Sequence, residues 1–113
     1  MTRITSHVLD TSAGRPAAGL TVRLERPGRG AAGTATLASA TTDAEGRISD
    51  WLPAGVSAGR YRIVFETGAW FRAAGRETLY PEVAVDFEVQ DGVSHYHLPL
   101  LLSPFGYSTY RGT

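Results

Sequence analysis

The chain is expected to fold as an all-β antiparallel sandwich, because three features of its 113 residues agree. Apolar and polar residues alternate with a period of two along most of the sequence, which is typical of strands with one buried face. Short clusters of Gly, Pro and Asp separate these segments and indicate turns. The resulting spacing of seven or eight short strands favours a sandwich.

The strands and turns can be placed in chain order. The clearest alternation puts these residues on apolar faces: Ile4, Ser6 and Val8; Leu20, Val22 and Leu24; Tyr61, Ile63 and Phe65; Val83, Val85, Phe87 and Val89. A further strand is expected at 94–102, and weaker strands around 35–42, 47–51 and 106–110. Turns are expected at 13–16, 27–30, 43–46, 53–55 and 90–92. The one candidate helix is 68–75, which is rich in Ala and bounded by Gly.

The outward faces of these strands differ in charge. On the segments 20–26, 60–66 and 82–90 the outward face is mainly charged, as expected for a solvated sheet. The first strand and the strand at 94–102 instead present uncharged residues: Thr5, His7 and Leu9, and His95, His97, Pro99 and Leu101. We expect the first, penultimate and last strands to share a sheet whose outer face is both a subunit interface and a pocket wall.

Composition excludes several classes of function. The 11 basic and 11 acidic residues are scattered and cancel, which argues against nucleic-acid and membrane partners. The chain has no Cys, and all its basic residues are Arg, so thiol and lysine nucleophiles are excluded. No signal peptide is expected, since residues 1–4 (MTRI) pass directly into a strand pattern, and no stretch approaches the ~20-residue apolar run of a membrane span. We expect a single domain over residues 1–113 and a cytoplasmic location.

The histidines are the first candidates for chemistry. His7 and His97 occupy equivalent outward faces of two strands, so their imidazoles can face one pocket if those strands are neighbours. A neutral imidazole can accept a proton from water near pH 7. Zinc binding is the rival use, with His95 as a third ligand, but no carboxylate or thiol is placed to complete a site. We therefore expect neither metal nor cofactor, and His95 at the pocket rim.

Arginines are the second group of candidates. Arg47 follows the turn at 43–46, where Asp43 can form an Asx turn and Gly46 can adopt a positive φ. Its guanidinium could bind adjacent oxygens of a planar substrate, although a solvated Arg in an ordinary hairpin would fit the same pattern. Arg111 follows Tyr110 at a terminus that could otherwise be disordered. Ser103 lacks the setting of a nucleophile elbow, so a serine hydrolase is not expected.

Two long stretches resemble the transthyretin-like family, and specifically its 5-hydroxyisourate hydrolases. They are 7–22 (HVLDTSAGRPAAGLTV) and 96–108 (YHLPLLLSPFGYS), followed by the terminal 110–113 (YRGT). The carrier branch of the family typically has Lys in place of His7 and Thr in place of His97, and it extends beyond the tetrapeptide. Two departures from the hydrolases are Thr113, where Ser is usual, and Leu98, where a β-branched residue is more common.

The resemblance implies a prealbumin-like antiparallel β-sandwich of two four-stranded sheets with one short helix, assembled as a homotetramer with pockets at the dimer–dimer interface. It also implies a reaction, in which water opens the lactam of 5-hydroxyisourate to give 2-oxo-4-hydroxy-4-carboxy-5-ureidoimidazoline in urate catabolism. The site residues expected are His7, Arg47, His97 and Thr113 for catalysis, with His7, Arg47, Tyr110 and Arg111 binding the substrate.

Which histidine is the base stays open at this point. Two alternatives to the enzyme also stay open on the same fold: a non-catalytic small-ligand carrier and a structural adaptor.

Overall fold

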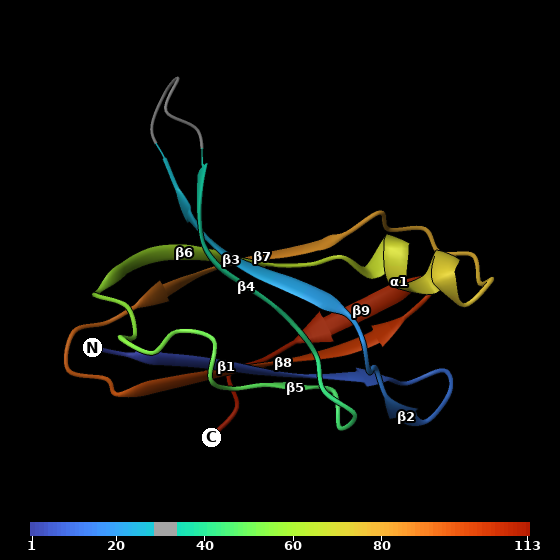
Figure 1. The fold of residues 1–113 in the computed structure, drawn as a ribbon, viewed down its shortest axis with the longest axis horizontal. Helices are drawn as coiled ribbons and strands as arrows, with labels where there is room; N and C mark the ends of the chain where they lie inside the picture. The colour runs from blue at the N-terminus through green and yellow to red at the C-terminus, as the bar shows by residue number, and fades with distance from the viewer. Residues whose placement is uncertain (29–33) are drawn as a thin grey trace.

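The computed structural model describes residues 1–28 and 34–113, which form two packed β-sheets and a short helix at one end (Figure 1). The elements are β1 (Arg3–Asp10), β2 (Arg15–Pro16), β3 (Thr21–Pro27), β4 (Thr34–Thr41), β5 (Arg47–Ile48), β6 (Gly59–Phe65), α1 (Thr67–Ala73), β7 (Val83–Val89), β8 (His95–Ser103) and β9 (Gly106–Thr109). The all-β sandwich expected from the sequence is confirmed. The turn expected at 27–30 extends into residues outside the described ranges.

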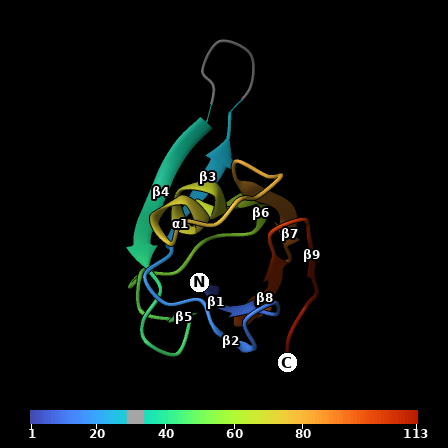
Figure 2. The same cartoon turned by 90° about the vertical axis from the view of Figure 1, so that its right-hand side faces the viewer.

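The first sheet has the order β2-β1-β8-β9, and β5 also pairs with β1. The two short strands β2 and β5 pair with different parts of the same edge of β1, at Leu9–Asp10 and at Ser6–His7. Five strands therefore occupy four positions among the residues described, where four strands were expected. The second sheet has the order β4-β3-β6-β7. Figure 2 shows β3, β4 and β6 of this sheet above β1 and β8 of the first.

The pairing of β1 with β8 is parallel and runs from Arg3 opposite His95 to Asp10 opposite Leu102. A purely antiparallel sandwich was expected, so this central pair is a difference. Its physical reason is that β1 and β8 are joined through the whole second sheet, and only a long connection allows neighbouring strands to run in the same direction. The parallel register decides which outward residues of the two strands meet.

The strand β5 is shorter than the expected 47–51, but the turn before it forms as predicted. The Asp43 carboxylate accepts the backbone N–H groups of Glu45 and Arg47, both at 2.9 Å. Gly46 has φ +78°, and a Cβ there would lie 2.4 Å from the Val8 carbonyl oxygen. The Val8 N–H in turn donates to the Gly46 carbonyl at 2.8 Å. Only glycine fits this contact, which fixes Arg47 beside β1.

The core lies between the two sheets and is built from the inward faces of their strands. Its large, fully buried members include Ile4, Val8, Val22, Leu24, Tyr61, Ile63, Phe65, Leu100 and Leu102. The outer face of the second sheet is charged, as expected, and Arg62 donates to Asp86 across β6 and β7 at 2.6 Å. The predicted alternation is therefore confirmed in both sheets, and the outer face of the first sheet carries uncharged side chains beside Arg3 and Arg47.

The helix α1 connects β6 to β7 and covers one end of the sandwich, close to the expected 68–75. Phe71 is fully buried in the core. Gly68 is required because a Cβ there would lie 2.4 Å from the Pro81 carbonyl oxygen. No helix within residues 1–28 and 34–113 is long and apolar enough to cross a bilayer.

Candidate active site

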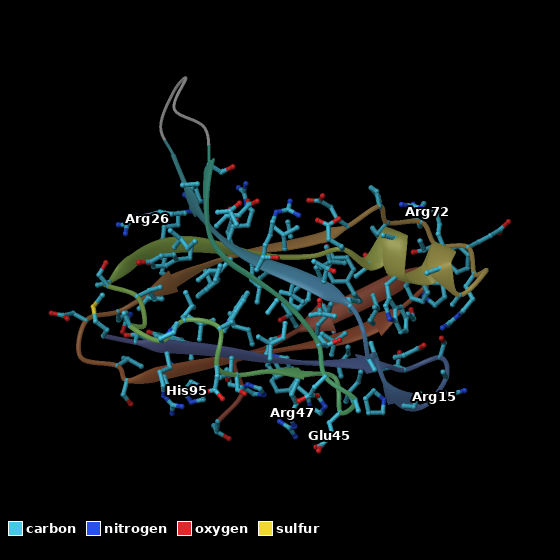
Figure 3. The ribbon with its side chains drawn as sticks, in the orientation of Figure 1. Arg15, Arg26, Glu45, Arg47, Arg72 and His95 are labelled. Carbon is cyan, nitrogen blue, oxygen red and sulfur yellow. The ribbon has the colours of Figure 1, made fainter. Side chains whose placement is uncertain are left out.

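The outward histidines meet because β1 and β8 are neighbours. The parallel register places Thr5 opposite His97, and the pairing of β5 with β1 places Arg47 opposite His7. Residues that face each other across paired strands lie on the same side of a sheet. The side chains therefore share the outer face of the first sheet, on which Figure 3 shows His95 and Arg47 directed away from the core.

A pocket of about 230 Å³ lies on this face. Its lining residues are Thr5, Ser6, Arg47, Ile48, Ser49, His95, His97 and Thr113. Three of the four catalytic residues expected from the sequence, Arg47, His97 and Thr113, therefore border one pocket although they are far apart in the chain. The fourth, His7, is paired with Arg47 but does not line the pocket.

His97 is the histidine whose surroundings suit a base. Its Nδ1 lies 2.8 Å from the Thr5 hydroxyl, and Nε2 has no hydrogen-bond partner in the part of the chain that is described. Burial lowers the pKa of His97, and the positive charges that His95 and His7 carry when protonated, together with that of Arg47, lower it further. The ring is therefore neutral near pH 7, with Nε2 available to water.

His7 is committed to a structural hydrogen bond. Its Nε2 lies 2.8 Å from the carbonyl oxygen of Glu45, in the turn before β5. A carbonyl can only accept, so Nε2 of His7 carries the proton and donates it. This contact ties the turn that carries Arg47 to β1. It leaves only Nδ1 of His7 as an acceptor.

The C-terminal segment returns over β8. The Gly112 N–H donates to the His97 carbonyl at 2.8 Å, and this bridge carries Thr113 to the pocket. A Cβ on Gly112 would lie 2.5 Å from Cδ2 of His97. The His97 ring thus packs directly under the backbone at Gly112, where only glycine fits.

Tyr110 and Arg111, expected to bind substrate, do not line the pocket. The Arg111 guanidinium lies 4.5 Å from the ring centroid of Tyr96, a cation–π contact, and Tyr110 is 55% exposed. The geometry explains the difference, because β9 pairs only with the last four residues of β8. Nearer the start of β8, this edge is met by the bridge between Gly112 and His97, and the neighbouring Arg111 reaches Tyr96 there.

Thr5 is the site residue that sequence reasoning missed. Its hydroxyl lies 2.6 Å from Nε2 of His95 and 2.8 Å from Nδ1 of His97. The sequence placed Thr5 on the outward face, two residues before His7, but gave it no role. The shared outward face of Thr5 and His7 was the available signal in the sequence. The contact of Thr5 with His95 and His97 depends on the parallel register of β1 and β8, which the sequence did not indicate.

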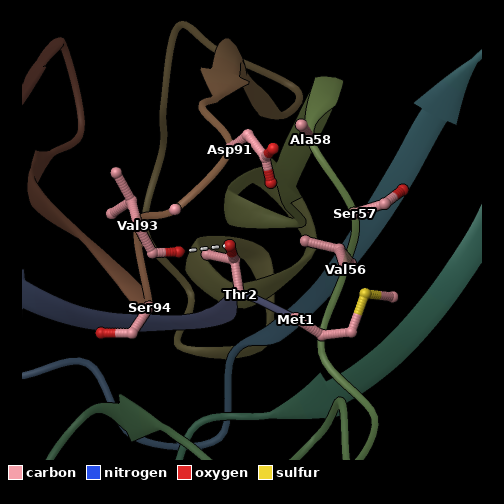
Figure 4. A pocket seen from close by; sticks show the side chains of 9 residues that line it. Met1, Thr2, Val56, Ser57, Ala58, Asp91, Val93 and Ser94 are labelled. Atoms are coloured by element: carbon pink, nitrogen blue, oxygen red, sulfur yellow. Dashed lines mark hydrogen bonds between the residues drawn. The ribbon is translucent and has the colours of Figure 1, made fainter.

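Other features of the described residues carry less chemistry. A hollow of about 360 Å³ at the end of the sandwich lies next to Met1, Val56 and Asp91 (Figure 4). Its described lining has neither histidine nor arginine, and the Thr2 hydroxyl there donates to the Val93 carbonyl. Within the described ranges, no three His, Asp or Glu side chains are grouped as metal ligands.

Comparisons with known proteins show what this chain is similar to. Residues 4–112 match the model of the HIUase/Transthyretin family. A 5-hydroxyisourate hydrolase of Salmonella dublin is 42% identical over 108 residues, which cover 95% of this chain and 78% of that protein. The solved 5-hydroxyisourate hydrolase of Klebsiella pneumoniae has a TM-score of 0.87 at 45% identity, covering 100% of this chain and 94% of the other.

A carrier matches the same fold. Sea bream transthyretin, solved in complex with thyroxine, also has a TM-score of 0.87, at 31% identity, covering 97% of this chain and 94% of the other. The two TM-scores are equal, so the backbone cannot separate hydrolase from carrier, and the side chains of the site must do so.

Proposed function

We propose a reaction for this chain, which belongs to the HIUase/Transthyretin family and is an enzyme of its 5-hydroxyisourate hydrolase branch. It opens the lactam of 5-hydroxyisourate to give 2-oxo-4-hydroxy-4-carboxy-5-ureidoimidazoline, and His97 is the general base. The hydrolase role in urate catabolism follows from the relatives. The observation that carries the mechanism is the pocket that Arg47, His97 and Thr113 share.

The first step in this proposal is removal of a proton from water. Nε2 of the neutral His97 accepts it as the water oxygen bonds to the lactam carbonyl carbon. General base catalysis of this kind typically contributes about 10²–10⁴-fold. The C–N bond of the lactam then breaks, and the departing nitrogen takes a proton. The water therefore ends as one hydroxyl on the carbonyl carbon and one hydrogen on the nitrogen.

The other site residues bind and position the reactants. Arg47 offers a planar set of donors to the adjacent oxygens of the flat substrate. Thr113 borders the pocket and presents its hydroxyl to the attacking water. His7 keeps the turn carrying Arg47 in place through Glu45. Arg111 supports the terminal segment from Tyr96. We keep Tyr110 as a substrate contact supplied within the assembly, since its ring is exposed.

The assembly we propose is a homotetramer of single-domain protomers in the cytoplasm, with pockets completed at the dimer–dimer interface. Its support is the outer face of the first sheet, which is uncharged at Leu9 and Leu101 and continues to Tyr107, a side chain 42% exposed. A pocket of about 230 Å³ on an open sheet face is also smaller than most ligand sites, which a second protomer would enlarge.

One assay tests the function. Generating 5-hydroxyisourate from urate with urate oxidase and following its ultraviolet band should show faster decay when this protein is present. His97→Ala should remove about 10²-fold or more of that acceleration while the protein stays folded by circular dichroism. Wild-type decay rates in His97→Ala would refute the role of this ring.

The second candidate is a small-ligand carrier, which the match to sea bream transthyretin favours. The same assay separates it from the enzyme. Binding of an aromatic ligand with no acceleration of 5-hydroxyisourate decay would support the carrier, whereas neither binding nor acceleration would leave the structural adaptor.

A further inference from the structure

The Thr5 hydroxyl links two imidazoles that do not touch each other. The ring centroids of His95 and His97 are 6.3 Å apart, yet Thr5 Oγ1 lies 2.6 Å from Nε2 of the first and 2.8 Å from Nδ1 of the second. Thr5 is 8% exposed, so water does not easily replace these contacts. A continuous path of hydrogen bonds therefore runs from His97, the proposed general base, through Thr5 to His95.

The number of protons on this path is fixed by the chemistry of the hydroxyl. Thr5 carries one proton and can donate it to only one of the two imidazoles. No other acceptor for this proton lies among the described residues, so the hydroxyl donates to one ring and accepts from the other. Whenever both histidines are neutral, their tautomers are thus coupled. When Nδ1 of His97 carries a proton, Nε2 of His95 does not.

We propose that Thr5 relays a proton between His97 and His95, so that His95 stores the proton taken from water until the lactam nitrogen departs. Thr5 is a positioning residue in this relay, because it acts through His97. The inference deepens the proposed hydrolysis and rests on it, but the bridge itself can be measured in the resting protein.

The relay balances at each step. Before reaction, His97 is protonated on Nδ1 and donates to Thr5, and Thr5 donates to the unprotonated Nε2 of His95. As Nε2 of His97 accepts a proton from water, the Nδ1 proton moves to Thr5 and the Thr5 proton moves to His95. When the C–N bond breaks, Nε2 of His97 gives its proton to the nitrogen, and the two transfers through Thr5 reverse.

The electrostatics of the pocket favour moving the charge away from His97. The groups that face this ring are His95 on β8, His7 on β1, Arg47 on β5 and the terminal residue Thr113. Burial and the positive charges among these groups lower the pKa of His97, so an imidazolium there is costly. His95 lies at the start of β8 and is directed outward, away from the core (Figure 3).

The experiment compares Thr5→Val, which is nearly isosteric but lacks the hydroxyl, with Thr5→Ser, which keeps it. We expect kcat to fall about 10-fold or more in Thr5→Val with KM within about twofold of wild type, and Thr5→Ser to recover most of the rate. Thr2→Val is the matched control, because Thr2 is also buried on the same chain segment but its hydroxyl donates to the Val93 carbonyl instead of a histidine. Its kcat should be unchanged.

A second readout does not depend on turnover. Imidazole ¹⁵N chemical shifts should show His97 mainly protonated on Nδ1 in wild type and Thr5→Ser, and shifted toward Nε2 protonation in Thr5→Val. A third variant, His95→Gln, keeps an acceptor for Thr5 but cannot store a proton, so its kcat should also fall about 10-fold.

The outcomes are distinguishable. Wild-type kcat in Thr5→Val and His95→Gln, with His97→Ala inactive, would overturn the relay and leave the proposed hydrolysis intact. Unchanged ¹⁵N shifts in Thr5→Val would overturn the hydroxyl bridge. A wild-type protein that does not accelerate 5-hydroxyisourate decay would refute the proposed function and the catalytic role of the relay together.

Discussion

Two histidines with the same face and similar strand positions differ in what their nitrogens can do. Nε2 of His7 is a donor to the Glu45 carbonyl, whereas Nε2 of His97 has no partner among the described residues. The sequence could predict that both face one side of the sheet, because alternation alone decides this. It could not predict which ring is the base, because that depends on hydrogen bonds to segments distant in the chain. Thr5 was missed for the same reason.

Gly112 gives a prediction at this scale. In Gly112→Ala the new Cβ would lie 2.5 Å from Cδ2 of His97 and 3.3 Å from Cγ of Pro99, so the ring or the terminal segment must move. A displacement of about 1 Å in an active site can cost about 10²-fold, and we expect kcat to fall at least 10-fold. The measurement is the decay of 5-hydroxyisourate, with thermal unfolding followed in parallel.

Gly106→Ala is the matched control for this variant. It lies in the same C-terminal region, but its Cβ would meet only the Ser103 hydroxyl oxygen, at 3.7 Å. We expect wild-type turnover in Gly106→Ala and similar melting temperatures for both variants. Equal activity of the two variants would show that His97 does not need the space that glycine leaves.

At the scale of elements, alternation and turn chemistry were enough to predict most strands. The Asx turn at Asp43 and the charged outer face of β6 and β7 are confirmed because each depends on residues close in sequence or on one repeated pattern. The parallel pairing of β1 with β8 was not predicted, since no local signal records the direction of a neighbour so far along the chain. The cation–π contact of Arg111 with Tyr96 was not predicted either, because the short extent of β9 is also non-local.

A second non-local contact joins the end of β1 to the segment after α1. The Asp10 carboxylate is 2% exposed and accepts from Arg76 at 2.7 Å, while its other oxygen accepts the N–H groups of Ser12 and Ala13 at 3.1 Å. Burial by itself would raise the pKa of Asp10, but the hydrogen bonds from Arg76, Ser12 and Ala13 lower it to about 2. The ionised pair therefore stabilises the fold at neutral pH.

Asp10→Asn tests this contact, because it keeps an oxygen for the turn and removes the charge. We expect it to lower the free energy of unfolding at pH 7 by about 2 kcal/mol, measured by urea titration at fixed protein concentration. The pKa is lowered on folding, so the stabilisation is complete above the unfolded value of about 3.9 and declines as pH falls toward 2. The difference from wild type should therefore shrink between pH 4 and pH 2.

The matched control is Asp86→Asn, which breaks ion pairs to Arg60 and Arg62 on the solvated face of the second sheet. Exposed pairs of this kind contribute no more than about 1 kcal/mol. A loss in Asp10→Asn no larger than in Asp86→Asn, or one that does not change with pH, would contradict a stabilising role for the buried pair.

At the scale of the whole molecule, the two outer faces of the sandwich are chemically different. The second sheet is covered with Arg, Glu and Asp side chains in ion pairs, whereas the first presents the pocket and, apart from Arg3 and Arg47, mainly uncharged side chains. Composition could not reveal this, since the charges of the chain cancel. The alternation of residues along each strand could reveal this difference, and it predicted that another subunit covers the outer face of the first sheet. Stable interfaces bury about 1,200–2,000 Å² in total, which a whole sheet face can supply.

Leu101→Arg is the sharpest test of that face. Leu101 is half-buried in the protomer, pairs with Leu9 and Ser108, and has no role in the core. In the proposed tetramer, four copies of the added guanidinium would be desolvated with no counter-charge to pair with, so light scattering should give a dimer or monomer. Turnover should also fall at least 10-fold, because each pocket would lose the wall that the second protomer supplies. Ala84→Arg adds the same charge to an exposed position of β7 and should leave both mass and rate unchanged. A Leu101→Arg protein with the wild-type mass would show that this face is not the interface, and one that dissociates but keeps the wild-type rate would show that the protomer, and not the assembly, completes the site.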